Sequence, residues 1–251
     1  MSETEVHRLV AYGVMAVGAI TFLALRFITA PYGRHGRGGW GPTMPERWGW
    51  VVMESPAVLG FAGIFLLGDH RAELAPLVLL GFWLLHYVNR TFVYPFRLAS
   101  KAKEMPVAVV AMAIVFNVTN AYLNARQISH LGAYPSGWLT DPRFVVGALL
   151  FLGGRQVNVW ADAQLLALKR EGKGYQIPRA GLYRLISCPN YFGEIVEWCG
   201  WAVMTWSLAG LSFAVFTFAN LAPRAISHHR WYRETFEDYP LERKAVLPWL
   251  W

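Results

Sequence analysis

A glutamate inside a long uncharged stretch is the first residue in this sequence that could do chemistry. Glu54 lies between Trp50 and Pro56, with no basic residue three or four positions away. Acidic side chains at membrane depth are costly and usually mark a functional cavity. A neutral Glu54 could donate a hydrogen bond to a carbonyl oxygen. The structural alternative is that Glu54 caps a helix kink at Pro56.

Hydroxyl and guanidinium groups alternate along one face of a later apolar segment. Helical spacing places Tyr87, Arg90, Thr91 and Tyr94 on one stripe, with Arg97 close to it. Such a stripe could hold a polar ligand. The alternative for Tyr94, and more weakly for the deeper Tyr87, is an aromatic anchor at the membrane interface.

A third set of polar residues, Arg155, Asn158 and Asp162, follows i, i+3, i+7 spacing and so shares a helix face. Arg155 and Asp162 could neutralise each other within the helix, or the face could bind a ligand. The basic, glycine-containing loop 169–179 comes next and suits phosphate groups. Basic loops of this kind also arise from membrane topology alone.

Two more helical faces carry polar groups near the C-terminus. Pro189 and Asn190 predict a preorganised helix start, and Glu194 and Glu197 follow one turn apart on the same face. These carboxylates enter an apolar span and need partners. The candidate partners fall at i, i+4, i+8 further along the chain: Arg224, His228 and Tyr232.

Several familiar sites are excluded by their context. The segment Gly36–Gly41 satisfies GxGxxG, but the flanking strand and helix of a dinucleotide-binding turn are missing. No GxSxG, HExxH or Walker sequence occurs, so serine hydrolase, zinc protease and P-loop chemistry have no support. Cys188 and Cys199 lack metal-ligand spacing and are expected to be packing residues. We expect no metal.

Long apolar stretches must position these residues. The chain of 251 residues is 55% hydrophobic and only 16% charged, with a mean hydropathy of +0.30. Because a bilayer core needs about 20 apolar helical residues, we expect spans at the following positions: Leu9–Leu25, Val51–Gly68, Leu74–Phe96, Met105–Tyr122, Phe144–Leu168 and Phe192–Ala222. The last is too long for one helix and is expected to turn near 206–210, which makes seven spans.

The positive charges test this count. Seven spans leave 16 lysines and arginines in the loops of one side and 4 on the other. Cytosolic loops retain positive charge, so the C-terminus is expected in the cytosol. The net charge of +7 is then a topology signal, and nucleic acid is not an expected partner. The sequence predicts an all-α polytopic membrane protein with a retained first helix, in one domain over residues 1–251.

Ordered motifs along most of the chain resemble the steroid 5-alpha-reductase family. The resemblance begins at Pro31–Pro42 and Met53–Pro56, and continues through His86–Tyr94 and Tyr175–Pro178. It is strongest at three further segments: Leu185–Trp198, Arg224–Tyr232 and Phe236–Pro240. One departure is Ser227, where some relatives have a further histidine.

This resemblance implies a seven-helix membrane reductase that uses NADPH to saturate the C4–C5 double bond of 3-oxo-Δ4-steroids. Glu54 and Tyr87 would bind the 3-oxo oxygen, and Trp50 and Trp198 would line the steroid pocket. The cofactor-binding part would lie mainly in 144–251. Its residues, with two at the end of the third span, would be Tyr94, Arg97, Asn158, Asp162, Arg170, Tyr175, Asn190, Glu194, Arg224, His228 and Tyr232.

The alternatives differ in substrate and cofactor. The chain could reduce another enone or an enoyl thioester lipid, or be a methyltransferase of the isoprenylcysteine type. A methyltransferase would have no need of Glu54 or Tyr87. A lipid transporter or sensor is the non-enzymatic alternative, but no pair of corresponding interrupted helices supports it. The expected partners are a steroid or other lipid enone and the bilayer, and the expected state is a monomer.

Overall fold

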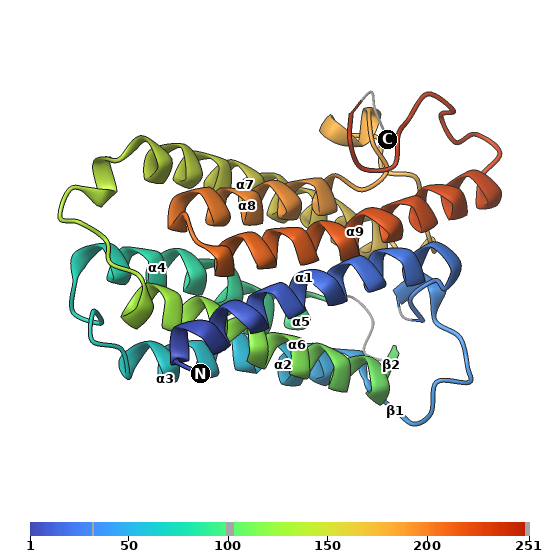
Figure 1. Cartoon of the computed structure of the whole chain (residues 1–251). Helices are drawn as coiled ribbons and strands as arrows, with labels where there is room; N and C mark the ends of the chain where they lie inside the picture. Colours follow the sequence, from blue (N-terminus) through green and yellow to red (C-terminus); the bar gives the residue numbers. More distant parts are fainter. Residues whose placement is uncertain (32, 99–102, 249–251) are drawn as a thin grey trace.

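The computed structural model describes residues 1–31, 33–98 and 103–248. Helices dominate these residues and lie along one another in an elongated bundle (Figure 1). Tyr32, which falls within the first resembling motif, and Lys101, which contributes to the charge count, lie outside the described residues.

Nine α-helices follow one another along the described residues. Their bounds are α1 Glu3–Phe27, α2 Glu46–Ser55, α3 Phe61–Leu66, α4 Leu74–Val88, α5 Tyr94–Arg97, α6 Val107–Arg126, α7 Pro142–Arg170, α8 Pro189–Thr205 and α9 Leu208–Thr235. Three π-helical turns are η2 Pro56–Gly60, η3 Asn89–Val93 and η4 Gln127–Leu131, and three 3₁₀ turns are η1 Gly33–His35, η5 Trp138–Thr140 and η6 Gly181–Arg184.

The π-helical turns join helices that would otherwise be separate. η2 connects α2 to α3, η3 connects α4 to α5, and η4 extends α6. The described residues therefore form seven helical rods, each covering one expected apolar stretch. Pro56 explains η2, because a proline inside a helix removes one backbone donor. η3 has no proline at its start, and π-turns of this kind often occur at functional sites.

The expected turn in the last apolar stretch is confirmed. α8 ends at Thr205, Trp206 adopts a left-handed conformation at φ 46°, and the Ser207 side chain caps α9. The α8 start is also confirmed, since Pro189 occupies the first turn. α9 continues to Thr235 despite Pro223.

The described residues are mostly helical, as expected, but they also include one short pair of strands. β1 Thr43–Pro45 pairs antiparallel with β2 Glu104–Pro106, and Met105, expected as the first residue of a span, lies in β2. Each strand ends in a proline, which favours extended backbone in the residue before it. α6 consequently begins at Val107.

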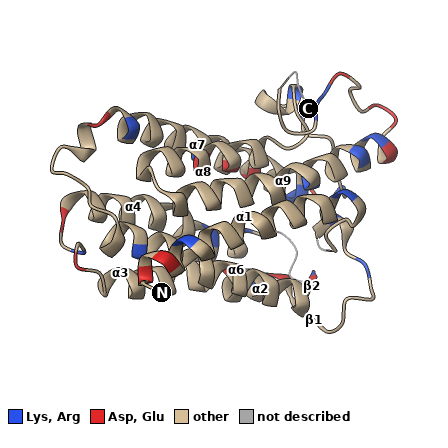
Figure 2. Cartoon of the chain, viewed as in Figure 1, with Lys and Arg blue, Asp and Glu red and all other residues tan. Residues whose placement is uncertain are grey.

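Five of the helical segments are long and apolar enough to cross a membrane. They are Glu3–Phe27, Glu46–Leu66, Val107–Leu131, Pro142–Arg170 and Leu208–Thr235. α4 and α8, with 15 and 17 residues, are shorter. Figure 2 shows that α1, α4 and α6 are uncharged along most of their length.

Candidate active site

A hydrogen-bonded network joins α7 to α8 in the interior of the bundle. The Asn190 side chain donates to Oδ1 of Asp162 at 3.0 Å. The Asn158 amide donates to the backbone oxygen of Asn190 at 3.0 Å and to Oε2 of Glu194 at 3.3 Å. Two α7 residues and two α8 residues that the sequence analysis proposed for one site therefore meet.

Glycines let these two helices approach closely. A Cβ added at Gly154 would lie 2.4 Å from the backbone nitrogen of Glu197, and one at Gly193 would lie 2.5 Å from that of Asn158. Real Cβ atoms do not approach so closely. The short helix separation brings the polar side chains of α7 and α8 within hydrogen-bonding reach.

Arg90 connects the network to η3 and α2. Its NH1 lies 3.5 Å from Oδ2 of Asp162. Its guanidinium carbon lies 4.6 Å from the Trp50 ring centroid and 4.8 Å from that of Tyr94, both within the range of cation–π attraction. Asp162 is thus neutralised from another helix. The hypothesis that Arg155 neutralises it within α7 is wrong for this structure.

Arg155 has a different partner. Its NH1 lies 3.8 Å from Oε1 of Glu197, and Nδ1 of His86 lies 2.9 Å from the same oxygen. Glu197 is fully buried. The partners that the sequence analysis required for its carboxylate come from α4 and α7, not from the α9 residues proposed there.

A small cavity lies between η3, α5 and α7. It is lined by His86, Asn89, Arg90, Tyr94, Arg97, Arg155, Asn158, Val159 and Asp162. Four of the proposed cofactor residues, Tyr94, Arg97, Asn158 and Asp162, line it. Its lining is rich in cations, and one acid balances them, which suits an anionic ligand.

Glu54 lies in α2, and Tyr87 lies in α4, which leads directly into η3. Oε2 of Glu54 accepts a hydrogen bond from Asn117 at 3.1 Å, and the same amide donates to the backbone oxygen of Met53 at 2.7 Å. The carboxyl group of Glu54 lies within electrostatic range of Tyr87 and of Arg90. The two residues proposed for a ketone therefore neighbour the residues proposed for a cofactor.

Tyr87 is held in an aromatic core. Its ring centroid lies 4.8 Å from that of Trp83 and 5.6 Å from that of Trp198. Trp198 also packs 4.2 Å from Phe213. Trp198 is thus a central residue of the core, whereas Trp50 lies under Arg90 and 5.8 Å from the ring of Tyr94.

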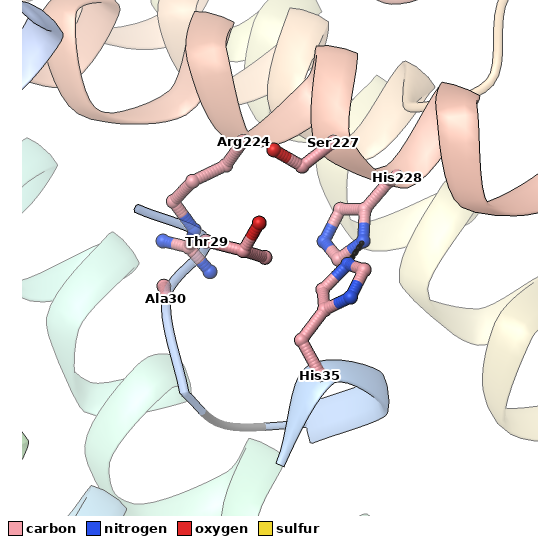
Figure 3. Close-up of a pocket in the computed structure, with 6 residues that line it drawn as sticks. All are labelled: Thr29, Ala30, His35, Arg224, Ser227 and His228. Atoms are coloured by element: carbon pink, nitrogen blue, oxygen red, sulfur yellow. Dashed lines mark hydrogen bonds between the residues drawn. The ribbon is translucent and has the colours of Figure 1, made fainter. Parts of the chain in front are cut away.

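A second polar cluster lies where α9 meets the loop after α1. NH2 of Arg224 donates to the Tyr191 hydroxyl at 3.0 Å, and this hydroxyl lies 3.1 Å from Nε2 of His228. Nδ1 of His228 lies 3.0 Å from Nε2 of His35. Figure 3 shows both imidazoles and the Arg224 side chain around a small pocket that also includes Ser227.

The charges around His35 disfavour its protonation. Burial, followed by the guanidinium groups of Arg34, Arg224 and Arg37, lowers the pKa of His35 from 6.5 to about 4. His35 is therefore neutral near pH 7. A neutral imidazole can accept or donate the hydrogen bond to His228.

Arg34 contacts two further residues proposed for the cofactor site, Tyr175 and Tyr232. Its guanidinium carbon lies 4.6 Å from the ring centroid of Tyr232 and 5.5 Å from that of Tyr175. Lys103 donates to the Tyr175 hydroxyl at 3.0 Å. Lys169 and Arg170, at the end of α7, are both exposed.

Some residues of these clusters were missed from sequence. Arg34 and His35 lie in the glycine-rich segment Pro31–Pro42, which the sequence analysis named as a resembling motif without assigning a site role to either residue. Asn117 had no signal beyond being polar inside an apolar stretch. His86 and Glu197 were visible as polar residues in spans, but their pairing could not be seen.

Comparisons with known proteins place the chain in a family. The family described as 3-oxo-5-alpha-steroid 4-dehydrogenase matches residues 103–251. A protein named steroid 5-alpha-reductase DET2, from Gossypium hirsutum, is 48% identical over 92% of this chain and 92% of its own length. A protein named 3-oxo-5-alpha-steroid 4-dehydrogenase 1, from Bos taurus, is 41% identical over 96% of this chain and 95% of its own length. Its counterpart from Homo sapiens is 40% identical over 100% and 97%.

These similarities cover nearly the whole chain at identities well above those of chance. Together with the apolar helices, they identify an integral membrane protein and an oxidoreductase. The chain belongs to the steroid 5-alpha-reductase, or 3-oxo-5-alpha-steroid 4-dehydrogenase, family.

Proposed function

We propose that this enzyme uses NADPH to reduce the C4–C5 double bond of 3-oxo-Δ4-steroids to 5α-reduced 3-oxosteroids. The observation that carries the proposal is the position of Arg90. Its guanidinium group bonds Asp162 of the α7–α8 network and lies within electrostatic range of Glu54. Arg90 thus links the proposed cofactor residues to Glu54, which lies within electrostatic range of Tyr87.

The residues present fit a phosphorylated dinucleotide. NH1 of Arg34 is buried and has no hydrogen-bond partner among the described residues, so it is available to an anion. We propose that Arg97 and Arg224, with Arg34, hold the phosphates. Asn158, Asp162, Asn190 and Glu194 supply the polar groups for the remainder of the cofactor, and Arg170, Tyr175, His228 and Tyr232 complete the site by resemblance.

NADPH, when bound, supplies the hydride. Glu54 and Tyr87 hold the 3-oxo oxygen by hydrogen bonds and stabilise the negative charge that develops there during reduction. Each donor contributes about 3 kcal/mol to the transition state, the scale known for oxyanion-hole groups. The aromatic residues around Tyr87, with Trp50 and Trp198, exclude water from the reacting ketone.

The topology that follows has seven spans, a cytosolic C-terminus and a single domain, with the cofactor site mainly in 144–251. It places the basic loops and the cluster around Arg34 on the cytosolic side, where NADPH is present. The steroid reaches the site from the apolar phase. We also propose that the enzyme acts as a monomer.

The decisive experiment measures NADPH oxidation by membranes that contain the protein. A 3-oxo-Δ4-steroid should support oxidation and gain two hydrogens by mass spectrometry, whereas its 5α-reduced product should support none. An enoyl-CoA thioester serves as the competing substrate. Reduction of the thioester alone would contradict the proposed substrate.

Two variants link the activity to the site. Glu54→Gln and Tyr87→Phe should each lose about two orders of magnitude in kcat, as expected for removal of an oxyanion donor. Both should keep their NADPH affinity, measured by fluorescence titration. Full turnover in both variants would remove their assignment to the ketone.

A further inference from the structure

A chain of buried amides leads from Trp201 of α8 through α6 to Tyr87. Nε1 of Trp201 donates to Oδ1 of Asn124 at 2.8 Å. Nδ2 of Asn124 donates to Oδ1 of Asn120 at 2.8 Å and to its backbone oxygen at 3.1 Å. Asn120 and Asn124 are each 1% exposed, and Trp201 is 0% exposed. Bulk water therefore does not compete for these groups.

The free end of this chain is the amide nitrogen of Asn120. It has no hydrogen bond of regular geometry within the described part of the chain. Besides Asn124, the Asn120 side chain lies close enough to Tyr87 to act on its hydroxyl group. A buried amide donor without a partner costs about 1–3 kcal/mol, so its retention beside Tyr87 calls for an explanation.

The indole at the other end sets the direction of every bond. Trp Nε1 can only donate, so Asn124 must present its oxygen to Trp201 and its nitrogen to Asn120. Asn120 must then present its oxygen to Asn124, because two NH2 groups would otherwise face each other. Its nitrogen is left to face Tyr87. The amide orientations therefore follow from one donor-only side chain.

We propose that this chain primes Tyr87 as a hydrogen-bond donor, with Asn120 as a positioning residue for the reaction. The Asn120 N–H donates to the phenolic oxygen of Tyr87, which leaves the Tyr87 O–H to donate to the substrate ketone. Successive hydrogen bonds that run in one direction polarise one another, so Tyr87 becomes a stronger donor as charge develops on the ketone oxygen. This inference rests on the proposed role of Tyr87.

The test is a set of double-mutant cycles with Tyr87→Phe. Asn120→Leu keeps the approximate volume and removes both hydrogen bonds, and should lower kcat about 5- to 10-fold, the worth of one neutral hydrogen bond. Trp201→Phe keeps an aromatic ring and removes the initiating N–H, and should lower kcat about 2-fold. In the Tyr87→Phe background, neither change should lower kcat further.

A spectroscopic readout separates positioning from packing. The carbonyl stretch of a bound 3-oxo-Δ4-steroid should move to higher frequency in Asn120→Leu, because its hydrogen bond from Tyr87 weakens. It should not move in Asn120→Leu when Tyr87 is already Phe. NADPH affinity should be unchanged in all variants, and thermal midpoints report whether each variant is folded.

The outcomes divide clearly. If Asn120→Leu and Tyr87→Phe lowered kcat independently, so that the double variant lost the product of the two factors, the proposed role of Asn120 would be wrong. An unchanged carbonyl stretch in Asn120→Leu would also contradict it. Asn120 would then be a packing residue. Asn120→Asp guards against misfolding of Asn120→Leu, because it preserves the shape and the acceptor for Asn124 while removing the donor to Tyr87. A normal kcat in Asn120→Asp would also contradict the proposed hydrogen bond from Asn120 to Tyr87. A fully active Tyr87→Phe would instead reject the proposed role of Tyr87 itself.

Discussion

Nδ1 of His86 lies 2.9 Å from Oε1 of Glu197, in a pair that ties α4 to α8. Both side chains are buried, and Arg155 of α7 approaches the same oxygen at 3.8 Å. One carboxylate thus holds three helices together. Because His86 precedes Tyr87 in α4, the pair also restrains the helix turn that carries the proposed ketone donor.

Removing this carboxylate should destabilise the protein. Glu197→Leu leaves His86 and Arg155 buried without their acceptor, at a cost of about 2–3 kcal/mol for lost charge-assisted hydrogen bonds. The thermal midpoint in detergent should fall by roughly 5–10 °C. Glu197→Gln keeps an oxygen for His86 and should lose less than half as much. Equal midpoints for Glu197→Leu and the unchanged protein would show that the pair does not stabilise the bundle.

Two neighbouring glycines of α7 should behave in opposite ways. A Cβ at Gly154 would lie 2.4 Å from a backbone atom of α8, whereas one at Gly153 would meet nothing within 4 Å. Gly154→Ala must push α8 away, at about 1–3 kcal/mol, and should weaken NADPH binding because Asn158 loses its register with Asn190. Gly153→Ala should be neutral or stabilising by up to about 1 kcal/mol, because alanine favours helix.

The measurement for this pair combines thermal midpoints with NADPH titration. Comparing adjacent alanine substitutions in one helix removes differences in expression and membrane insertion. If Gly153→Ala and Gly154→Ala weakened NADPH binding equally, the close approach of α7 and α8 would not be what positions Asn158.

Local signals explain which parts of the fold could be predicted. The start of α8 follows from Pro189, and the turn at Trp206 follows from an uncharged run that is too long for one span. The β1–β2 pairing could not be foreseen, because Thr43 and Pro106 meet only after the chain has folded back on itself. Short strands also carry too few residues to show an alternating pattern.

In the candidate site, relations within one helix could be predicted from the sequence, whereas contacts between helices could not. Helical spacing correctly placed Asn158 and Asp162 on one face, because that relation lies within one helix. It also left open a pairing of Arg155 with Asp162. The structure instead pairs Asp162 with Arg90, which comes from another helical rod whose rotation the sequence does not specify. The contact of His35 with His228 spans 193 positions and has no local signal.

Asn190 offers a direct test of the proposed cofactor site. Asn190→Ala removes the hydrogen bond to Asp162 and should weaken NADPH binding about 10- to 100-fold, as expected for a bond to a charged group. The steroid should still bind, because Glu54 and Tyr87 are untouched. Thr140→Ala, in η5 at the opposite end of α7, is the control and should titrate normally. An unchanged NADPH affinity in Asn190→Ala would exclude Asn190 from the cofactor site.

His35 should make stability depend on pH in one defined window. Its pKa falls from 6.5 to about 4 on folding, through burial and then the charges of Arg34, Arg224 and Arg37. Between these values the unfolded chain binds more protons than the folded one, so stability from this group is present above pH 6.5 and is lost as the pH falls toward 4. Below about 4 the loss levels off.

The comparison with His35→Gln isolates this effect. Glutamine does not titrate, yet it can still hydrogen-bond His228, so the variant should lose less stability than the unchanged protein between pH 6.5 and 4. Thermal midpoints in detergent, measured for both proteins from pH 8 to 4, check the prediction. The difference between the two curves should grow only inside the window. Parallel curves throughout would mean that His35 is not held neutral by its surroundings, and the packing of the loop after α1 against α9 would need another explanation.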